Sequence, residues 1–224
     1  MQPDTSHARY RLVLLAAFAV FWLWMAIDPV NRHDWALENL LVLGVAAALL
    51  AARRHYRPSP TAATLIVVYL VLHEIGAHYT YAKVPYDAAW QALTGHSLNE
   101  AMGWQRNQYD RLVHFGYGLL LAYPFREVQM RLGLRPGLWS YLLPINLVLA
   151  TSAIYELIEW MGAVALDGGL GRAFLAAQSD EWDAQKDMAL AALGSLLAMG
   201  ATALLQRAPA PARARAALER SPAR

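Results

Sequence analysis

Residues 62–81 read AATLIVVYLVLHEIGAHYTY, an apolar run whose only ionisable residues at neutral pH, His73, Glu74 and His78, come near its end. A helix of about 20 residues crosses the roughly 30 Å hydrocarbon core of a bilayer. The run is therefore predicted to be a membrane-spanning helix. Charged side chains inside a bilayer cost free energy, from about 2.5 kcal/mol each upward, so their presence in such a helix needs a reason.

Further apolar segments lie on both sides of this run. The chain is 57% hydrophobic and only 16% charged, which is far more apolar than an average soluble domain. The predicted spans are residues 11–27, 37–52, 62–81, 109–126, 138–162 and 184–206. The fold class is therefore all-α, a polytopic membrane protein built as a six-helix transmembrane bundle. Residues 1–206 are predicted to form a single transmembrane helical domain.

The arginines predict the orientation. They are concentrated before the first span, after the second, after the fourth, and in the C-terminal segment. The positive-inside rule then places both termini in the cytoplasm and the connections 28–36, 82–108 and 163–183 outside. Residues 207–224 are predicted to be a disordered basic cytoplasmic tail. A cleaved signal peptide over residues 1–27 is the competing interpretation, but the apolar run is long for one and no A-x-A-like site follows it, which favours an uncleaved anchor.

Several chemistries are excluded by what the sequence lacks. The chain has no cysteine, which removes disulfides, thiolate nucleophiles and sulfur ligands. It also has no glycine-rich phosphate-binding loop, no G-x-S-x-G elbow and no H-E-x-x-H motif. The net charge of +2 comes mostly from the C-terminal segment, and no nucleic-acid binding is expected. Nitrogen and oxygen ligands remain.

Ionisable residues from four predicted spans fall at one depth, in the outer half of the membrane. They are His73, Glu74 and His78 in the third span, Asp110 and His114 in the fourth, Glu156 and Glu159 in the fifth, and Asp183 and Asp187 at the start of the sixth. A bundle that brings these ends together would hold a site for a metal ion or for protons.

The spacing of these residues predicts individual roles. Glu74 with His78, and Asp110 with His114, lie one helical turn apart and share a face. The predicted metal ligands are His78, His114, Glu156, Asp110 and Asp183. Glu74 or Asp187 is predicted to be the general base, and Arg111 to hold an anionic group of the substrate. Histidine and carboxylate ligands suit a divalent metal such as Zn, Mn or Fe(II).

Each residue also has a structural explanation. His73 can be a hydrogen-bonded core histidine, Arg111 can extend towards the headgroups, and Glu159 can be a solvated interfacial charge. Lys186 can neutralise a neighbouring carboxylate, which would favour an ion-paired network over a metal site.

Several motifs carry a resemblance to a known family. They are GAHYTY at 76–81 followed by Val84-Pro85, Arg106-Asn107, Tyr109-Asp110-Arg111, His114-Phe115, Tyr155-Glu156, Glu159-Trp160, Trp182-Asp183, Gln185 and Asp187-Met188. With these blocks the chain resembles the YjdF-like family of bacterial inner-membrane proteins, a domain of unknown function. The resemblance implies a multi-pass protein of the bacterial inner membrane and supplies no established reaction. A weaker similarity is to VanZ-like membrane proteins, from which the chain departs at Ala191, where an Asn is expected.

Three functions compete on this evidence. The first is a metal-dependent hydrolase or transferase that acts on a lipid or lipid-linked envelope substrate at the outer, periplasmic side, with membrane lipids as its surroundings. The second is a proton-coupled transporter that uses the same residues as a relay. The third is a non-catalytic structural or accessory membrane protein whose polar residues fix the helix register. The oligomeric state stays open.

Overall fold

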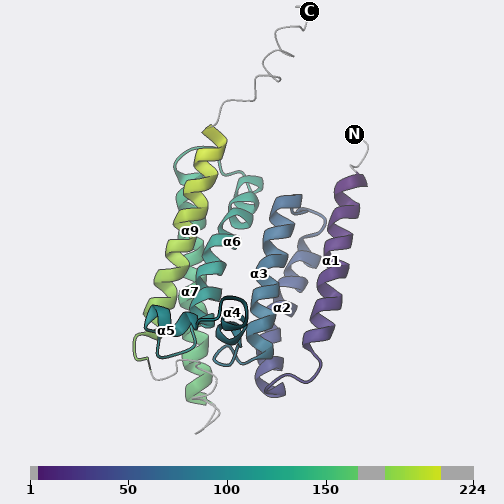
Figure 1. The fold of residues 1–224 in the computed structure, drawn as a ribbon. Helices are drawn as coiled ribbons and strands as arrows, with labels where there is room; N and C mark the ends of the chain where they lie inside the picture. The colour runs from purple at the N-terminus through teal and green to yellow at the C-terminus, as the bar shows by residue number, and fades with distance from the viewer. Residues whose placement is uncertain (1–4, 166–179, 208–224) are drawn as a thin grey trace, which may run out of the picture.

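The computed structural model describes residues 5–165 and 180–207, and all regular structure in these residues is helical. The long helices run side by side and the start of α1 lies at the same end of the bundle as the end of α9 (Figure 1). The predicted all-α fold class is confirmed for these residues. The predicted tail lies outside them, apart from Arg207, which ends α9.

The long helices coincide with the predicted spans but differ at their ends. They are α1 (Thr5–Met25), α2 (Arg32–Ala52), α3 (Pro60–His78), α6 (Tyr109–Arg131), α7 (Trp139–Ala165) and α9 (Asp183–Arg207). Five of them, all but α6, are long and apolar enough to cross a membrane. Helix α6 differs because charged residues stand at both of its ends and small and polar residues lie between them.

Local sequence explains where α3 begins and ends. Ser59 caps the N-terminus by accepting a hydrogen bond from the Ala62 amide, and Pro60 occupies the first turn, where its missing N–H is not needed. The helix stops at His78, three residues earlier than predicted, because Thr80 and Tyr81 adopt left-handed conformations with φ of 54° and 50°. This turn folds the Tyr81 ring back onto α3.

Helix α6 occupies the centre of the bundle. It packs against α9, α3 and α7, while α3 packs in turn against α1 and α2. The backbones of α6 and α9 approach each other closely, since a Cβ atom added to Gly118 would lie 1.9 Å from the Ala191 carbonyl oxygen. Two short helices, α4 (Tyr86–Thr94) and α5 (Leu98–Met102), lie at the end of the bundle where α6 begins (Figure 1). The central position of α6 brings its first two turns against three other helices.

Candidate functional site

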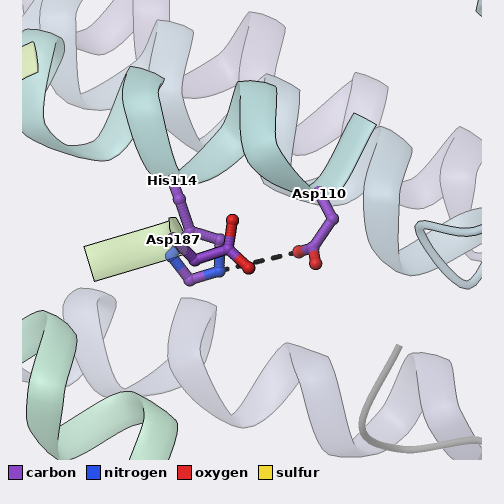
Figure 2. Close-up of side chains that lie close together, drawn as sticks. All are labelled: Asp110, His114 and Asp187. Carbon is purple, nitrogen blue, oxygen red and sulfur yellow. Dashed lines mark ion pairs between the residues drawn. The ribbon is translucent and has the colours of Figure 1, made fainter. Parts of the chain in front are cut away.

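Asp110, His114 and Asp187 form a compact group at the start of α6 and α9. One ligand atom from each lies within 4.8 Å of the others. Figure 2 shows the three side chains converging, with Asp110 and His114 projecting from α6 one turn apart. His114 Nε2 is 3.6 Å from Asp110 Oδ1. Asp110 and Asp187 are 7% and 2% exposed and the His114 side chain is 11% exposed, so two buried carboxylates meet a half-buried imidazole.

Two glycines allow these helices to meet closely. The Cβ position of Gly194 on α9 lies 2.3 Å from the Phe115 carbonyl oxygen, so only a residue without a side chain fits there. Gly118 fills the same role on α6. Since both glycines lie within about two turns of the polar group, the close contact between the helix backbones holds Asp187 against His114.

Glu156 of α7 faces the other side of the His114 ring. Its Oε1 is 3.7 Å from His114 Nδ1, so each ring nitrogen faces a carboxylate. Among the described residues, neither Glu156 Oε1 nor Asp187 Oδ1 has a hydrogen-bond partner, although both atoms are buried. Buried carboxylate oxygens without partners are costly, and a bound cation or a shared proton would satisfy them.

A second layer of charges lies outside this group, at the mouth of the bundle. Arg106 forms an ion pair with Asp183, and Arg111 forms one with Asp180. Asp180 also accepts hydrogen bonds of 2.7 and 2.9 Å from Lys186 Nζ. The hydrogen bond from Lys186, with help from the Trp182 amide and Arg111, lowers the pKa of Asp180 to about 2. The outer acids are thus paired with basic side chains, and Arg106 also comes within 3.8 Å of Asp110, which leaves Asp187 as the acid of the group with no ion pair to Arg or Lys among the described residues.

The outer ion pairs involve two residues for which the sequence predicted a role in the site. Asp183, a predicted metal ligand, pairs with Arg106 and lies outside the group of three. Arg111, the predicted substrate anchor, already bonds Asp180 and donates a 3.0 Å hydrogen bond to Gln108. Arg106 received no role from sequence reasoning beyond its place in the family motifs. Its position just before α6, four residues ahead of Asp110, was the available signal, and the two side chains come within 3.8 Å of each other.

The ionisable residues of α3 point in three different directions. Glu74 is fully buried and faces Asn39 and Trp35 of α2. Its oxygens make no hydrogen bond of good geometry to a described residue. His78 donates from Nδ1 to the Met25 carbonyl of α1 at 2.8 Å. Neither residue belongs to the group of three ligand-bearing side chains.

His73 is the α3 residue that faces the interior near α6 and α7. Its Nε2 donates to the Glu38 carbonyl at 3.1 Å, and its Nδ1 accepts a 2.6 Å hydrogen bond from the Tyr81 hydroxyl. The Tyr81 ring reaches this position because it lies over Gly76, where a Cβ would be 2.4 Å from the ring. His73 is thus a hydrogen-bonded core histidine, the structural alternative considered for it.

A cavity of about 280 Å³ adjoins the group of three. Asp110 and His114 form part of its wall, and most of the remaining wall is aromatic or aliphatic. The other lining residues are Leu41, Tyr69, His73, Tyr81, Val113, Tyr117, Thr151, Ser152, Ile154, Tyr155 and Ile158. The cavity therefore offers an apolar compartment with a polar end.

The donor set of the group fits a divalent cation. Metal–ligand bonds of about 2.0–2.2 Å place two ligands of one ion up to roughly 4.4 Å apart. The atoms of Asp110, His114 and Asp187 are within 4.8 Å of one another, so small side-chain movements would complete a site. Glu156 on the far nitrogen of His114 matches the outer carboxylate that commonly orients a metal-binding imidazole.

Comparison with known proteins agrees with this description. A model of the family described as "Predicted membrane protein (DUF2238)" matches residues 10–208. The chain is 37% identical over 189 residues to the inner membrane protein YjdF of Escherichia coli strain K12, and the alignment covers 83% of this chain and 86% of that protein. No solved structure matches the chain. The family resemblance read from the sequence motifs is confirmed, and the protein is a multi-pass protein of the inner membrane. The chain belongs to the DUF2238 family of predicted membrane proteins.

Proposed function

We propose that this protein is a divalent-metal-dependent enzyme, a hydrolase or transferase, that acts on a lipid or lipid-linked envelope substrate at the periplasmic side of the inner membrane. One observation carries the proposal. The ligand atoms of Asp110, His114 and Asp187 converge within 4.8 Å beside a cavity, and a buried oxygen of Asp187 has no hydrogen-bond partner among the described residues. Buried carboxylates that converge with an imidazole, one of them with an unpaired oxygen, are typical of metal sites.

The proposal includes a topology. Helix α6, the fourth predicted span, also crosses the membrane and brings the number of spans to six, because its 23 residues extend about 35 Å and residues 112–125 contain no Asp, Glu, Lys or Arg. The distribution of arginines then places both termini in the cytoplasm and the Asp110 end of α6 at the periplasmic face. The described helices form one transmembrane domain in this proposal.

Each residue near the site receives a role. Asp110, His114 and Asp187 would hold the ion, which would supply an activated water as nucleophile. Glu156 would accept a hydrogen bond from His114 Nδ1 and so present Nε2 to the ion. Arg111 would hold an anionic headgroup in exchange for Asp180, which keeps Lys186 as its counter-ion. Glu74 and His78 lie outside the cavity lining, and we assign them no ligand role.

Metal content tests the proposal directly. The protein is purified in detergent without chelators, and Zn, Mn and Fe are measured by mass spectrometry in the parent and in His114→Ala and Asp187→Asn variants. We expect near-stoichiometric metal in the parent and loss in both variants. His96→Ala is the matched control, because His96 is exposed on the loop after α4. A folded parent that stays metal-free after dialysis against each ion would refute the metal site.

The same experiment includes His78→Ala, because sequence reasoning made His78 a ligand. The hydrogen bond between His78 and Met25 supports retention of metal in this variant. Loss of metal there, as complete as in His114→Ala, would instead assign His78 to the site.

A structural network is the second candidate, and the outer charge layer favours it. Arg106, Arg111 and Lys186 already compensate Asp180 and Asp183, as expected of residues that fix helix register. This alternative predicts that His114→Ala lowers the free energy of unfolding while the parent contains no metal. A proton-coupled transporter predicts instead that the parent, without metal, acidifies loaded vesicles in a His114-dependent manner.

A further inference from the structure

The cavity beside Asp110 and His114 lies between two helices, α2 and α7, that are joined by little backbone packing. Helix α7 packs against α6 and α9, and α2 packs against α3, but α2 and α7 make no comparable contact within the described residues. Leu41 on α2 and Ile154 and Ile158 on α7 line the cavity between them. The two isoleucines are nonetheless 54% and 55% exposed. The cavity therefore opens sideways between α2 and α7, towards the surroundings of the bundle.

Those surroundings are hydrocarbon. Both α2 and α7 are among the helices apolar enough to cross a membrane. Along α6, the lining runs from Asp110 to Tyr117, a rise of about 10 Å. The compartment thus begins at the polar group and extends about 10 Å along the membrane normal, with an apolar mouth.

We propose that this compartment binds one hydrocarbon chain of a membrane lipid, which enters between α2 and α7 and leaves its polar headgroup beside Asp110 and His114. The inference deepens the proposed function, on which it rests for the role of the headgroup site. The volume of about 280 Å³ lies just below the roughly 300–1,000 Å³ typical of pockets for whole small molecules, so it suits part of one chain and not a complete lipid.

Within the part of the chain that the structure describes, one hydrogen bond crosses the mouth of the compartment. The Tyr155 hydroxyl on α7 donates to the Glu38 carboxylate on α2 at 3.1 Å. Glu38 also holds α3, because its backbone carbonyl accepts from His73. The bridge joins Tyr155, which itself lines the cavity between Ile154 and Ile158, to Glu38, about one turn before Leu41 on α2, so it ties the two helices together beside the cavity.

Neighbouring positions on α7 provide a matched test. Ile158 lines the cavity, whereas Leu157 is 57% exposed and does not. Ile158→Trp narrows the mouth, and Leu157→Trp adds the same bulk on another face of the helix. The parent and both variants are purified, washed repeatedly in lipid-free detergent and analysed by native mass spectrometry for retained lipid.

We expect one tightly held lipid per parent molecule, unchanged retention in Leu157→Trp and about tenfold lower retention in Ile158→Trp. Ser152→Phe, which fills the cavity from inside at a residue that is 3% exposed, should lose the lipid in the same way. Size-exclusion profiles check that each variant is folded. Equal retention in Ile158→Trp and Leu157→Trp, or no retained lipid in the parent, would overturn the inference.

The metal measurement separates this inference from the proposed function. Ile158→Trp should keep the metal of the parent while losing the lipid. His114→Ala should lose the metal and still retain the chain. A parent with bound lipid and no metal would overturn the enzyme proposal and support the chain-binding compartment.

Discussion

The contact between α6 and α9 makes a sharp prediction for Gly118→Ala. The new Cβ would lie 1.9 Å from the Ala191 carbonyl oxygen and 2.8 Å from the Ser195 amide nitrogen. Real Cβ atoms essentially never approach closer than 3.0 Å, and both obstacles are backbone atoms that no rotamer change can move. The two helices must therefore separate by about 1 Å, because the packed interior has no space to absorb the methyl group.

Two effects follow from this separation. Overpacking of this kind costs about 1–3 kcal/mol of the free energy of unfolding. The movement also increases the distance between His114 on α6 and Asp187 on α9. Functional groups need to be held within about 0.5 Å of their working geometry, so metal retention should fall in the same variant.

The assay is the free energy of unfolding, measured by titration with a denaturing detergent, together with metal content. Gly200→Ala is the control, because a Cβ at this exposed position of α9 meets nothing within 4 Å. Alanine is favoured over glycine in a helix by about 1 kcal/mol, so the control should be neutral or stabilising. The reasoning is refuted if Gly118→Ala is no less stable than Gly200→Ala.

Three further substitutions test the polar contacts. Lys186 lowers the pKa of Asp180 to about 2. The ionised Asp180 side chain therefore stabilises the folded state fully above pH 3.8, and this stabilisation is lost as the pH falls towards 2. Asp180→Asn should flatten this part of an acid-unfolding curve relative to the parent. Tyr81→Phe leaves a buried nitrogen of His73 unpaired and should lower the free energy of unfolding by about 1–3 kcal/mol, whereas an unchanged value would contradict the hydrogen bond. Arg126 is 8% exposed and hydrogen-bonded at the opposite end of α6, so Arg126→Met should cost a similar amount, about 1–3 kcal/mol, in the same titration.

Part of the site could be predicted from the sequence, because the depth of a residue in the membrane follows from its position along a span. Asp110 and His114 are one turn apart on α6, and their proximity to each other needs only helix geometry. Asp187 reaches them because α6 and α9 approach closely at Gly118 and Gly194. A pattern of small residues indicates that a helix packs closely, but it does not show which neighbour it meets or how the two helices are rotated. The general base and ligand roles of Glu74 and His78 remain untested predictions, for residues whose side chains face α2 and α1.

The third span shows why direction around a helix is harder to predict than depth. Glu74 and His78 share a helix face, which favoured them as a ligand pair, and adjacent His73 was given a structural explanation. In the structure, His73 is the one of these three residues that lines the cavity. Contacts with distant segments of the chain decide which face of α3 packs against α1, α2 or α6. Because this span is apolar on nearly all faces, its hydrophobic periodicity does not reveal those contacts.

The amino-acid sequence by itself determined that the chain is helical, crosses the membrane repeatedly and carries its ionisable residues near one face, because hydropathy and helix length are local properties. Only the tertiary structure decided which of those residues meet. Asp183 pairs with Arg106, whereas Asp187, one turn deeper on α9, joins His114 and Asp110. The physical reason is that long-range packing sets the rotation and the spacing of each helix, through glycines that admit a neighbouring backbone and through arginines that neutralise the nearest acid.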